Sequence, residues 1–109
     1  MELKTRELYE KSEEPLLCKK IMNFAEQLLS QENVVMTNAQ RLSLLSHISA
    51  MVYRSKHNEK IQPVDTFLFQ EVSEGSINMA NKICEILPDL HKDEKYLLSI
   101  HFESARLND

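Results

Sequence analysis

The sequence predicts an all-α fold, a compact bundle of five helices. One glycine and three prolines in 109 residues leave little material for the tight turns of a sheet protein. Apolar residues recur at intervals of three and four through most of the chain, which is typical of amphipathic helices. A hydrophobic content of 42% and a charged content of 28% are those of an ordinary globular protein. A chain of this length holds one hydrophobic core.

We expect a charged leader over residues 1–13 and a helical domain over residues 14–109. The leader offers only Leu3, Leu8 and Tyr9 as weak anchors, so we expect it to be frayed, with at most a helical turn or two. Its charge excludes a secretory signal peptide. No apolar run reaches the ~18 residues of a membrane span. We therefore expect a cytoplasmic protein without membrane insertion.

The first two helices are predicted from their start signals and apolar stripes. Pro15 suits the first turn of a helix over roughly 15–31, whose inward positions are Leu17, Ile21, Phe24, Ala25 and Leu28. Thr37 and Gln40 have the spacing of a capping box and open the second helix. That helix runs toward a polar loop at 55–60, and its core-facing stripe comprises Leu44, Leu45, Ile48, Met51 and Val52.

Three shorter helices are predicted in the second half of the chain. Pro63 opens a short third helix, with Val64, Phe67, Leu68 and Val72 inward. A break at 73–76 contains the single glycine, Gly75. The fourth helix turns Ile77, Ala80, Ile83, Cys84 and Leu87 inward and is stopped by Pro88. Asp93 caps the fifth helix, which runs to about Arg106 with Leu97, Leu98, His101 and Ala105 on one face.

Two histidines lie on helices, each with a charged residue seven positions away. His47 and Arg54 fall on the same shoulder of the second helix, about 10 Å apart along its axis, too far for a hydrogen bond within the helix. They are placed to flank a groove against another helix. His101 lies inside the apolar stripe of the fifth helix, and Glu94 lies on the same face.

A neutral imidazole is a natural phosphoryl acceptor near neutral pH, because one ring nitrogen keeps a nucleophilic lone pair. A phosphoryl group would bring a charge close to −2, to which the guanidinium of Arg54 is complementary. Glu94 could orient the tautomer of His101. The alternative is that both histidines are structural, each satisfied by a local carbonyl or carboxylate. His57 and His91 lie in polar segments and are expected to be solvated.

Composition and spacing argue against several other functions. With a net charge of −4 and Lys19–Lys20 as the one adjacent basic pair, direct binding of nucleic acid is not expected. Cys18 and Cys84 lack metal or redox spacing and are expected to be reduced, partly buried thiols. The histidines lack metal-ligand spacing. No catalytic triad or phosphate-binding loop is present, so we expect no catalytic residues, no cofactor and no enzyme.

The two histidine segments together resemble the PTS regulation domain, or PRD, of bacterial antiterminators and activators that the sugar phosphotransferase system controls. The resemblance spans about residues 15–107. Its pieces are Leu44-x-x-His47-Ile48 with Arg54 seven residues on, then Pro63-Val64, Ala80-x-x-Ile83, and Glu94 seven residues before His101.

This resemblance implies a five-helix bundle that forms a homodimer or pairs with another PRD-containing regulator. It implies phosphorylation of His47 and His101 by the phosphocarrier HPr or by an enzyme II B component, with Arg54 and Glu94 near the phosphate. The module would be a switch for transcription or antitermination. The alternatives are a structural dimerisation or adaptor domain with inert histidines, and a small enzyme.

Overall fold

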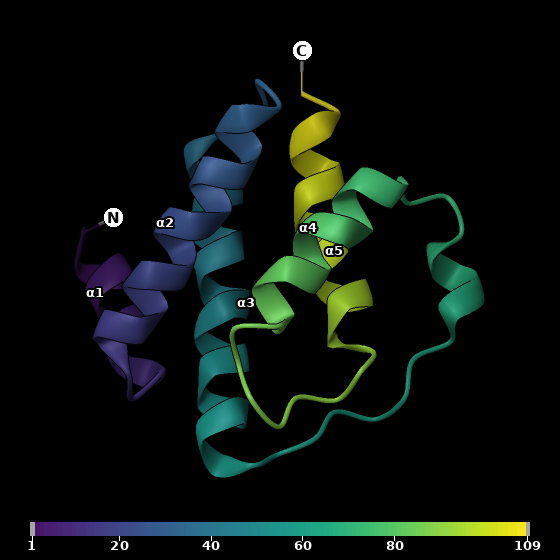
Figure 1. The fold of residues 1–109 in the computed structure, drawn as a ribbon. Coiled ribbons are helices and arrows are strands. Elements are labelled where there is room, and N and C mark those ends of the chain that lie inside the picture. Colours follow the sequence, from purple (N-terminus) through teal and green to yellow (C-terminus); the bar gives the residue numbers. More distant parts are fainter. Residues whose placement is uncertain (1, 109) are drawn as a thin grey trace.

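The protein is built from α-helices, as Figure 1 shows for this computed structural model, which describes residues 2–108. Five α-helices follow one another: α1 (Glu2–Lys11), α2 (Pro15–Gln31), α3 (Asn38–His57), α4 (Glu74–Cys84) and α5 (Glu94–Arg106). One 3-10 turn, η1 (Thr66–Phe69), lies between α3 and α4, and the described residues contain no strand. The predicted all-α fold with five helices is confirmed, although one of the five lies where none was expected.

The charged segment that was expected to be a frayed leader forms α1 and packs against α3. Leu8 is only 7% exposed and joins the hydrophobic core. The buried hydroxyl of Ser49 on α3 donates a hydrogen bond to the carbonyl of Leu8. A short charged helix has little stability of its own, so these contacts hold it in place. Residues 1 and 109 lie outside the described part, and the proposed boundary at residues 13–14 stays a prediction.

The long helices α2 and α3 begin as predicted. Pro15 occupies the first turn of α2, which ends at Gln31. Thr37 and Gln40 form a complete capping box at the start of α3: the Gln40 backbone N–H donates to the Thr37 hydroxyl, and the Thr37 N–H donates to the Gln40 side chain. The helix α3 continues to His57, beyond the predicted start of the loop, and ends where Asn58 adopts the left-handed conformation.

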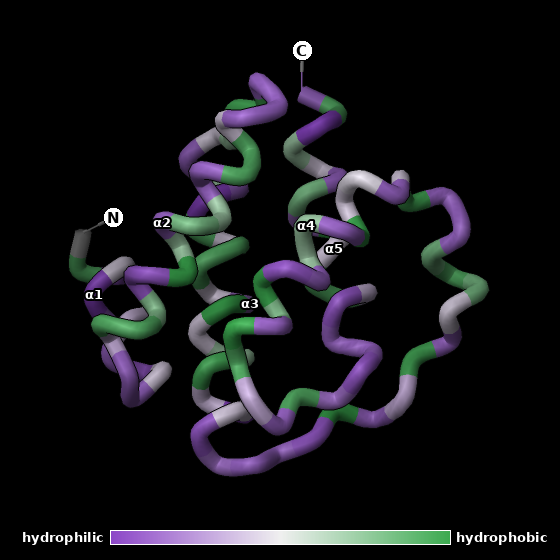
Figure 2. The backbone as a smooth tube through the Cα atoms, viewed as in Figure 1, coloured by the Kyte–Doolittle hydropathy of each residue, from purple (hydrophilic) through white to green (hydrophobic). Residues whose placement is uncertain are grey.

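The predicted third helix is wrong. Pro63 is followed by irregular chain, and only the single turn η1 is helical. Its carboxylate cap is Asp65, which accepts a hydrogen bond from the Phe67 N–H. Phe67 and Leu68, which were expected to face inward, are 69% and 74% exposed, whereas Phe69 is buried. In Figure 2 the chain before this turn is largely hydrophilic. In Figure 1 this turn lies at the edge of the molecule, and Phe69 is the residue of the turn that packs against α5, beside Tyr96. Because Phe67 and Leu68 have no such contact, a longer helix is not held there.

The helices α4 and α5 pack closely on each other and cover one side of α2 and α3. The predicted break at 73–76 is instead the start of α4: Ser73 is the N-cap, and Gly75 lies in the first turn. Asp93 occupies the N-cap position of α5 but makes no side-chain cap. Its carboxylate instead accepts a hydrogen bond from the Val64 N–H at 3.2 Å, tying the long loop to α5.

Candidate functional site

The four candidate residues lie together where α3 packs against α5. These helices run in opposite directions, so the beginning of α5 meets the end of α3 (Figure 1). His47 and Arg54 are seven residues apart on α3, and Glu94 and His101 are seven residues apart on α5. Equal spacing on antiparallel helices brings the four side chains into two cross-helix pairs, about 10 Å apart along the axis. We call this arrangement the α3–α5 seam.

The first pair of the seam is an ion pair between Arg54 and Glu94. The guanidinium donates from Nε to Oε2 at 2.7 Å and from Nη2 to Oε1 at 2.8 Å. The Glu94 side chain is fully buried, and that of Arg54 is 20% exposed. This two-bond geometry is the strongest that a guanidinium and a carboxylate can form. A buried carboxylate is tolerated here because both of its oxygens are paired with a cation.

The second pair is formed by the two histidines. The rings of His47 and His101 have centroids 5.0 Å apart and are tilted by 51°. From the sequence, His47 and Arg54 share one shoulder of a helix, and Glu94 and His101 share one face of another. The structure joins the two charged groups to each other and the two imidazoles to each other. The seven-residue spacings were the available signal, but the pairing also needs the direction of α5 relative to α3.

The burial of the two histidines differs from the sequence prediction in one case. His47 lies at the edge of the α3 stripe and is half-buried, as its shoulder position predicts. His101 was expected inside the stripe of α5, but it is also half-buried, and the fully buried aromatic is its neighbour Phe102. Leu98 and Ala105 are buried as predicted, but Phe102 completes the core face of the helix, while Leu97 and His101 are only half-buried.

Both imidazoles are neutral at neutral pH. Burial, then the neighbouring His101 and then Arg54 lower the pKa of His47 to about 4. Burial also lowers the pKa of His101 below its ordinary value. Within residues 2–108, His47 Nε2 is a fully buried nitrogen without a hydrogen-bond partner. A neutral ring with an unpaired nitrogen retains the lone pair that a nucleophile needs.

The other two histidines lie outside the seam. His57 was expected in a loop but lies in the last turn of α3, where its Nε2 is 2.9 Å from a Glu13 carboxylate oxygen. His91 accepts a hydrogen bond at Nδ1 from the Asp93 backbone N–H. Cys18 and Cys84 are free thiols whose pKa values burial raises to about 11 and about 12, so both stay protonated. No group of three metal-ligating side chains occurs among the described residues.

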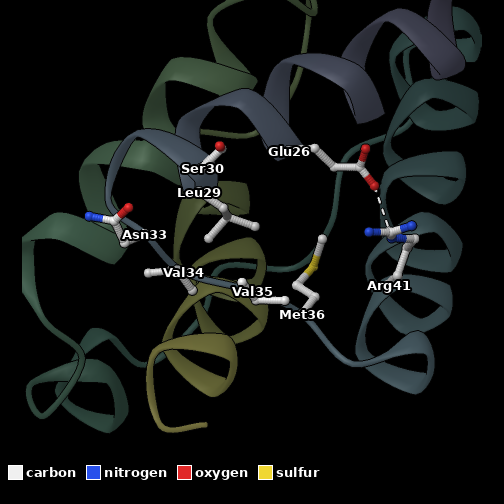
Figure 3. A pocket seen from close by; sticks show the side chains of 8 residues that line it. All are labelled: Glu26, Leu29, Ser30, Asn33, Val34, Val35, Met36 and Arg41. Atoms are coloured by element: carbon white, nitrogen blue, oxygen red, sulfur yellow. Dashed lines mark ion pairs between the residues drawn. The ribbon is translucent and has the colours of Figure 1, made fainter. Parts of the chain in front are cut away.

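A hollow of about 330 Å³ lies at the other end of α3, between the end of α2 and the segment that joins the two helices (Figure 3). Arg41 and Glu26 form an ion pair of 2.9 Å at one side of it. The rest of its wall comprises Leu29, Ser30, Asn33, Val34, Val35 and Met36. Neither seam histidine lines this hollow, so we place the candidate site at the seam instead.

Comparison with known proteins identifies the family. Residues 19–105 match the PRD domain. The chain belongs to the PRD domain family. Its fold is similar to that of a PRD-containing transcription regulator from Lactobacillus casei ATCC 334, with a TM-score of 0.88 and 31% sequence identity over 95% of this chain and 93% of that chain. No curated protein matches the sequence significantly.

None of the described helices is both long enough and apolar enough to span a membrane. The longest, α3, carries charged and polar residues on its outer face, including Arg41 and Lys56.

Proposed function

We propose that this domain is a phosphorylatable regulatory module of the bacterial sugar phosphotransferase system and that it accepts phosphoryl groups on His47 and His101. The observation that carries the proposal is the pair of neutral imidazoles, 5.0 Å apart, beside the Arg54–Glu94 ion pair. Membership of the PRD domain family supports it. The domain is an acceptor of the phosphoryl group and not an enzyme.

The α3–α5 seam gives phosphorylation a means of changing the structure. A phosphoryl group on either ring adds nearly two negative charges and several hydrogen-bond acceptors. The closest cation in the seam is Arg54, which the buried carboxylate of Glu94 already holds. If Arg54 turns toward the phosphate, Glu94 loses its partner, and an unpaired buried charge is costly. The packing of α3 against α5 must then change.

The partners follow from this role. The phosphoryl donor is HPr or an enzyme II B component, and the phosphorylated and free forms differ in how they pair with a second copy or with another PRD-containing regulator. Through that pairing the module modulates transcription or antitermination, without binding nucleic acid itself. The similar structure from Lactobacillus casei is that of a transcription regulator, which supports this output. A cytoplasmic location is part of the same proposal, because the donors act there.

A second candidate function is a dimerisation or adaptor domain that is never phosphorylated. The observation in its favour is the burial of His47 Nε2, which a donor protein cannot reach in this conformation. In this role the seam is only a packing contact, and Arg54 and Glu94 only fix the register of α3 and α5.

Incubation with phosphoenolpyruvate, enzyme I, HPr and a set of enzyme II B components separates the two functions. Phosphohistidine is labile in acid, so the proposal predicts an acid-labile label on the wild-type protein. Absence of label with every donor would contradict the phosphorylation proposal and favour the adaptor.

A further inference from the structure

The rings of His47 and His101 are spaced as two ligands of one metal ion would be. An imidazole nitrogen binds Zn²⁺ at about 2.0–2.1 Å, and the centre of its ring lies about 1.2 Å behind that nitrogen. Two rings on one tetrahedral ion therefore have centroids about 5.2 Å apart. In the seam the centroids are 5.0 Å apart, and the ring planes are tilted by 51°. This spacing fits a single ion held by one nitrogen of each ring, reached by rotation of the side chains without movement of the helices.

The seam also contains a nitrogen that lacks a partner. Within residues 2–108, His47 Nε2 is fully buried and makes no hydrogen bond. Leaving a buried polar atom unpaired is costly, and a metal ion would supply the missing partner. The histidines outside the seam differ in this respect, because His57 Nε2 lies 2.9 Å from a Glu13 carboxylate oxygen and His91 Nδ1 accepts the Asp93 N–H. The unpaired nitrogen therefore lies where the second imidazole is already close.

The charges and the solvent exposure of the seam are compatible with a divalent cation. Arg54 would repel such an ion, but the carboxylate of Glu94 neutralises it through two hydrogen bonds. Both histidines are only half-buried, so water can reach the remaining coordination positions of the ion. Imidazole nitrogens suit Zn²⁺, Ni²⁺ and Cu²⁺, whereas Mg²⁺ prefers oxygen ligands. The chemistry of the two side chains therefore selects a late transition metal.

We infer that His47 and His101 bind one divalent late transition-metal ion across the seam, with water in the other coordination positions. The ion joins α3 to α5, and its binding does not depend on the function proposed above. It also competes with a phosphoryl group for the two rings, and this second effect does rest on the proposed function. The sequence argued against a metal site because no helix carries two histidines at ligand spacing; here each of two helices supplies one ligand.

Thermal unfolding with and without metal tests the site. Zn²⁺ at 1 mM should raise the unfolding midpoint of the wild-type protein by at least about 3 °C, because an ion that binds only the folded state stabilises it. His47→Gln and His101→Gln should each lose this rise. The double variant His57→Gln/His91→Gln, which removes the histidines outside the seam, should keep it, and Mg²⁺ should have no such effect. A wild-type rise in either seam variant, or no rise in the wild-type protein, would overturn the inference.

Electron paramagnetic resonance of Cu²⁺ bound to the wild-type protein gives a readout that needs no variant. One equivalent of Cu²⁺ should show coupling to the nitrogens of two imidazoles, and a spectrum with only one imidazole would overturn the shared site.

Phosphorylation with and without Zn²⁺ tests the competition. At the lowest Zn²⁺ concentration that gives the full rise in midpoint, labelling of the domain should fall at least fivefold, while labelling of HPr by enzyme I in the same mixture, the control, is unchanged. Unchanged labelling of the domain would overturn the competition. Absence of label without Zn²⁺ would contradict the proposed function alone, because binding of the ion is measured without a phosphoryl donor.

Discussion

The carboxylate of Glu94 is completely buried, and Arg54 from α3 holds both of its oxygens, at 2.7 and 2.8 Å. Seven residues away on each helix, His47 and His101 face each other. The ion pair therefore fixes the register at which the two imidazoles meet. A charged pair in this position has consequences for stability and for any negative charge that is added beside it.

Loss of Arg54 should lower the free energy of unfolding by more than loss of Glu94. Arg54→Met should lower the free energy of unfolding by about 3–5 kcal/mol, because it leaves Glu94 buried without a cation. Glu94→Gln should cost less, because Arg54 is 20% exposed and can turn to water. Urea denaturation of the two single variants and the double variant measures this asymmetry and the coupling. Equal costs for the two single variants would contradict the account of a buried, cation-dependent carboxylate.

The low pKa of His47 makes stability depend on pH. Between the ordinary histidine pKa of 6.5 and the folded value of about 4, the unfolded state binds more protons than the folded state. Stability contributed by the neutral ring is therefore complete above pH 6.5 and is lost as the pH falls toward 4. Compared with His47→Gln, the wild-type protein should lose up to about 3 kcal/mol more over this range.

The control for this pH dependence is Phe67→Ala, which changes an exposed side chain that carries no titratable group. Its stability should fall with pH in parallel with that of the wild-type protein. The measurement is the free energy of unfolding from urea titrations at several pH values between 4 and 7. If His47→Gln also followed the wild-type curve, His47 would not be a buried neutral ring.

The single glycine, Gly75, lies directly against the guanidinium of Arg106. A Cβ at Gly75 would lie 2.6 Å from Nη2 of Arg106, whose guanidinium also binds Ser76 and pairs with Glu32 at 2.6 Å. Gly75→Ala in a helix normally gains up to about 1 kcal/mol. We expect that gain in an Arg106→Ala background and its loss or reversal when Arg106 is present. Thermal unfolding of the wild type, the two single variants and the double variant tests this. An equal change in stability from Gly75→Ala with and without Arg106 would contradict the contact.

The two phenylalanines of η1 should differ in their contribution to stability, because one is buried and the other is exposed. Phe69 is 7% exposed and lies near Tyr96, with ring centroids 5.7 Å apart, so Phe69→Ala should cost about 3 kcal/mol. Phe67→Ala, the matched control at a position that is 69% exposed, should change stability by less than about 0.5 kcal/mol. A larger cost at Phe67 than at Phe69 would mean that the loop packs in the orientation first predicted from the sequence.

Local signals predicted α2 and the start of α3, because Pro15, Thr37 and Gln40 act within a few residues of themselves. The other elements depend on contacts between segments that lie far apart in the sequence. The charged α1 is held by the burial of its own Leu8 and by the hydrogen bond from Ser49 of α3 to the Leu8 carbonyl, and no periodicity in the segment indicates either contact. The third helix was wrongly predicted from Pro63 and a short apolar run, which cannot hold a helix without a surface to pack on.

At the candidate site too, local signals in the sequence identified the residues, whereas long-range packing determined their contacts. The sequence identified His47, Arg54, Glu94 and His101 as four residues at matching spacings. It did not identify which would touch, because that depends on the antiparallel packing of α3 on α5. The position of His101 was also missed: its two neighbours in the core, Leu98 and Phe102, set the rotation of the helix.

Phosphorylation of two double variants tests the central proposal most directly. His47→Ala/His101→Ala removes both seam imidazoles, and His57→Ala/His91→Ala removes the same number of histidines elsewhere. Each protein is incubated with phosphoenolpyruvate, enzyme I, HPr and the enzyme II B components, and its intact mass is measured at alkaline pH. We predict an acid-labile phosphoryl group on the wild-type protein and on the second variant, and none on the first. Equal phosphorylation of both double variants, or none of the wild-type protein, would contradict the assignment of His47 and His101 as phosphoryl acceptors.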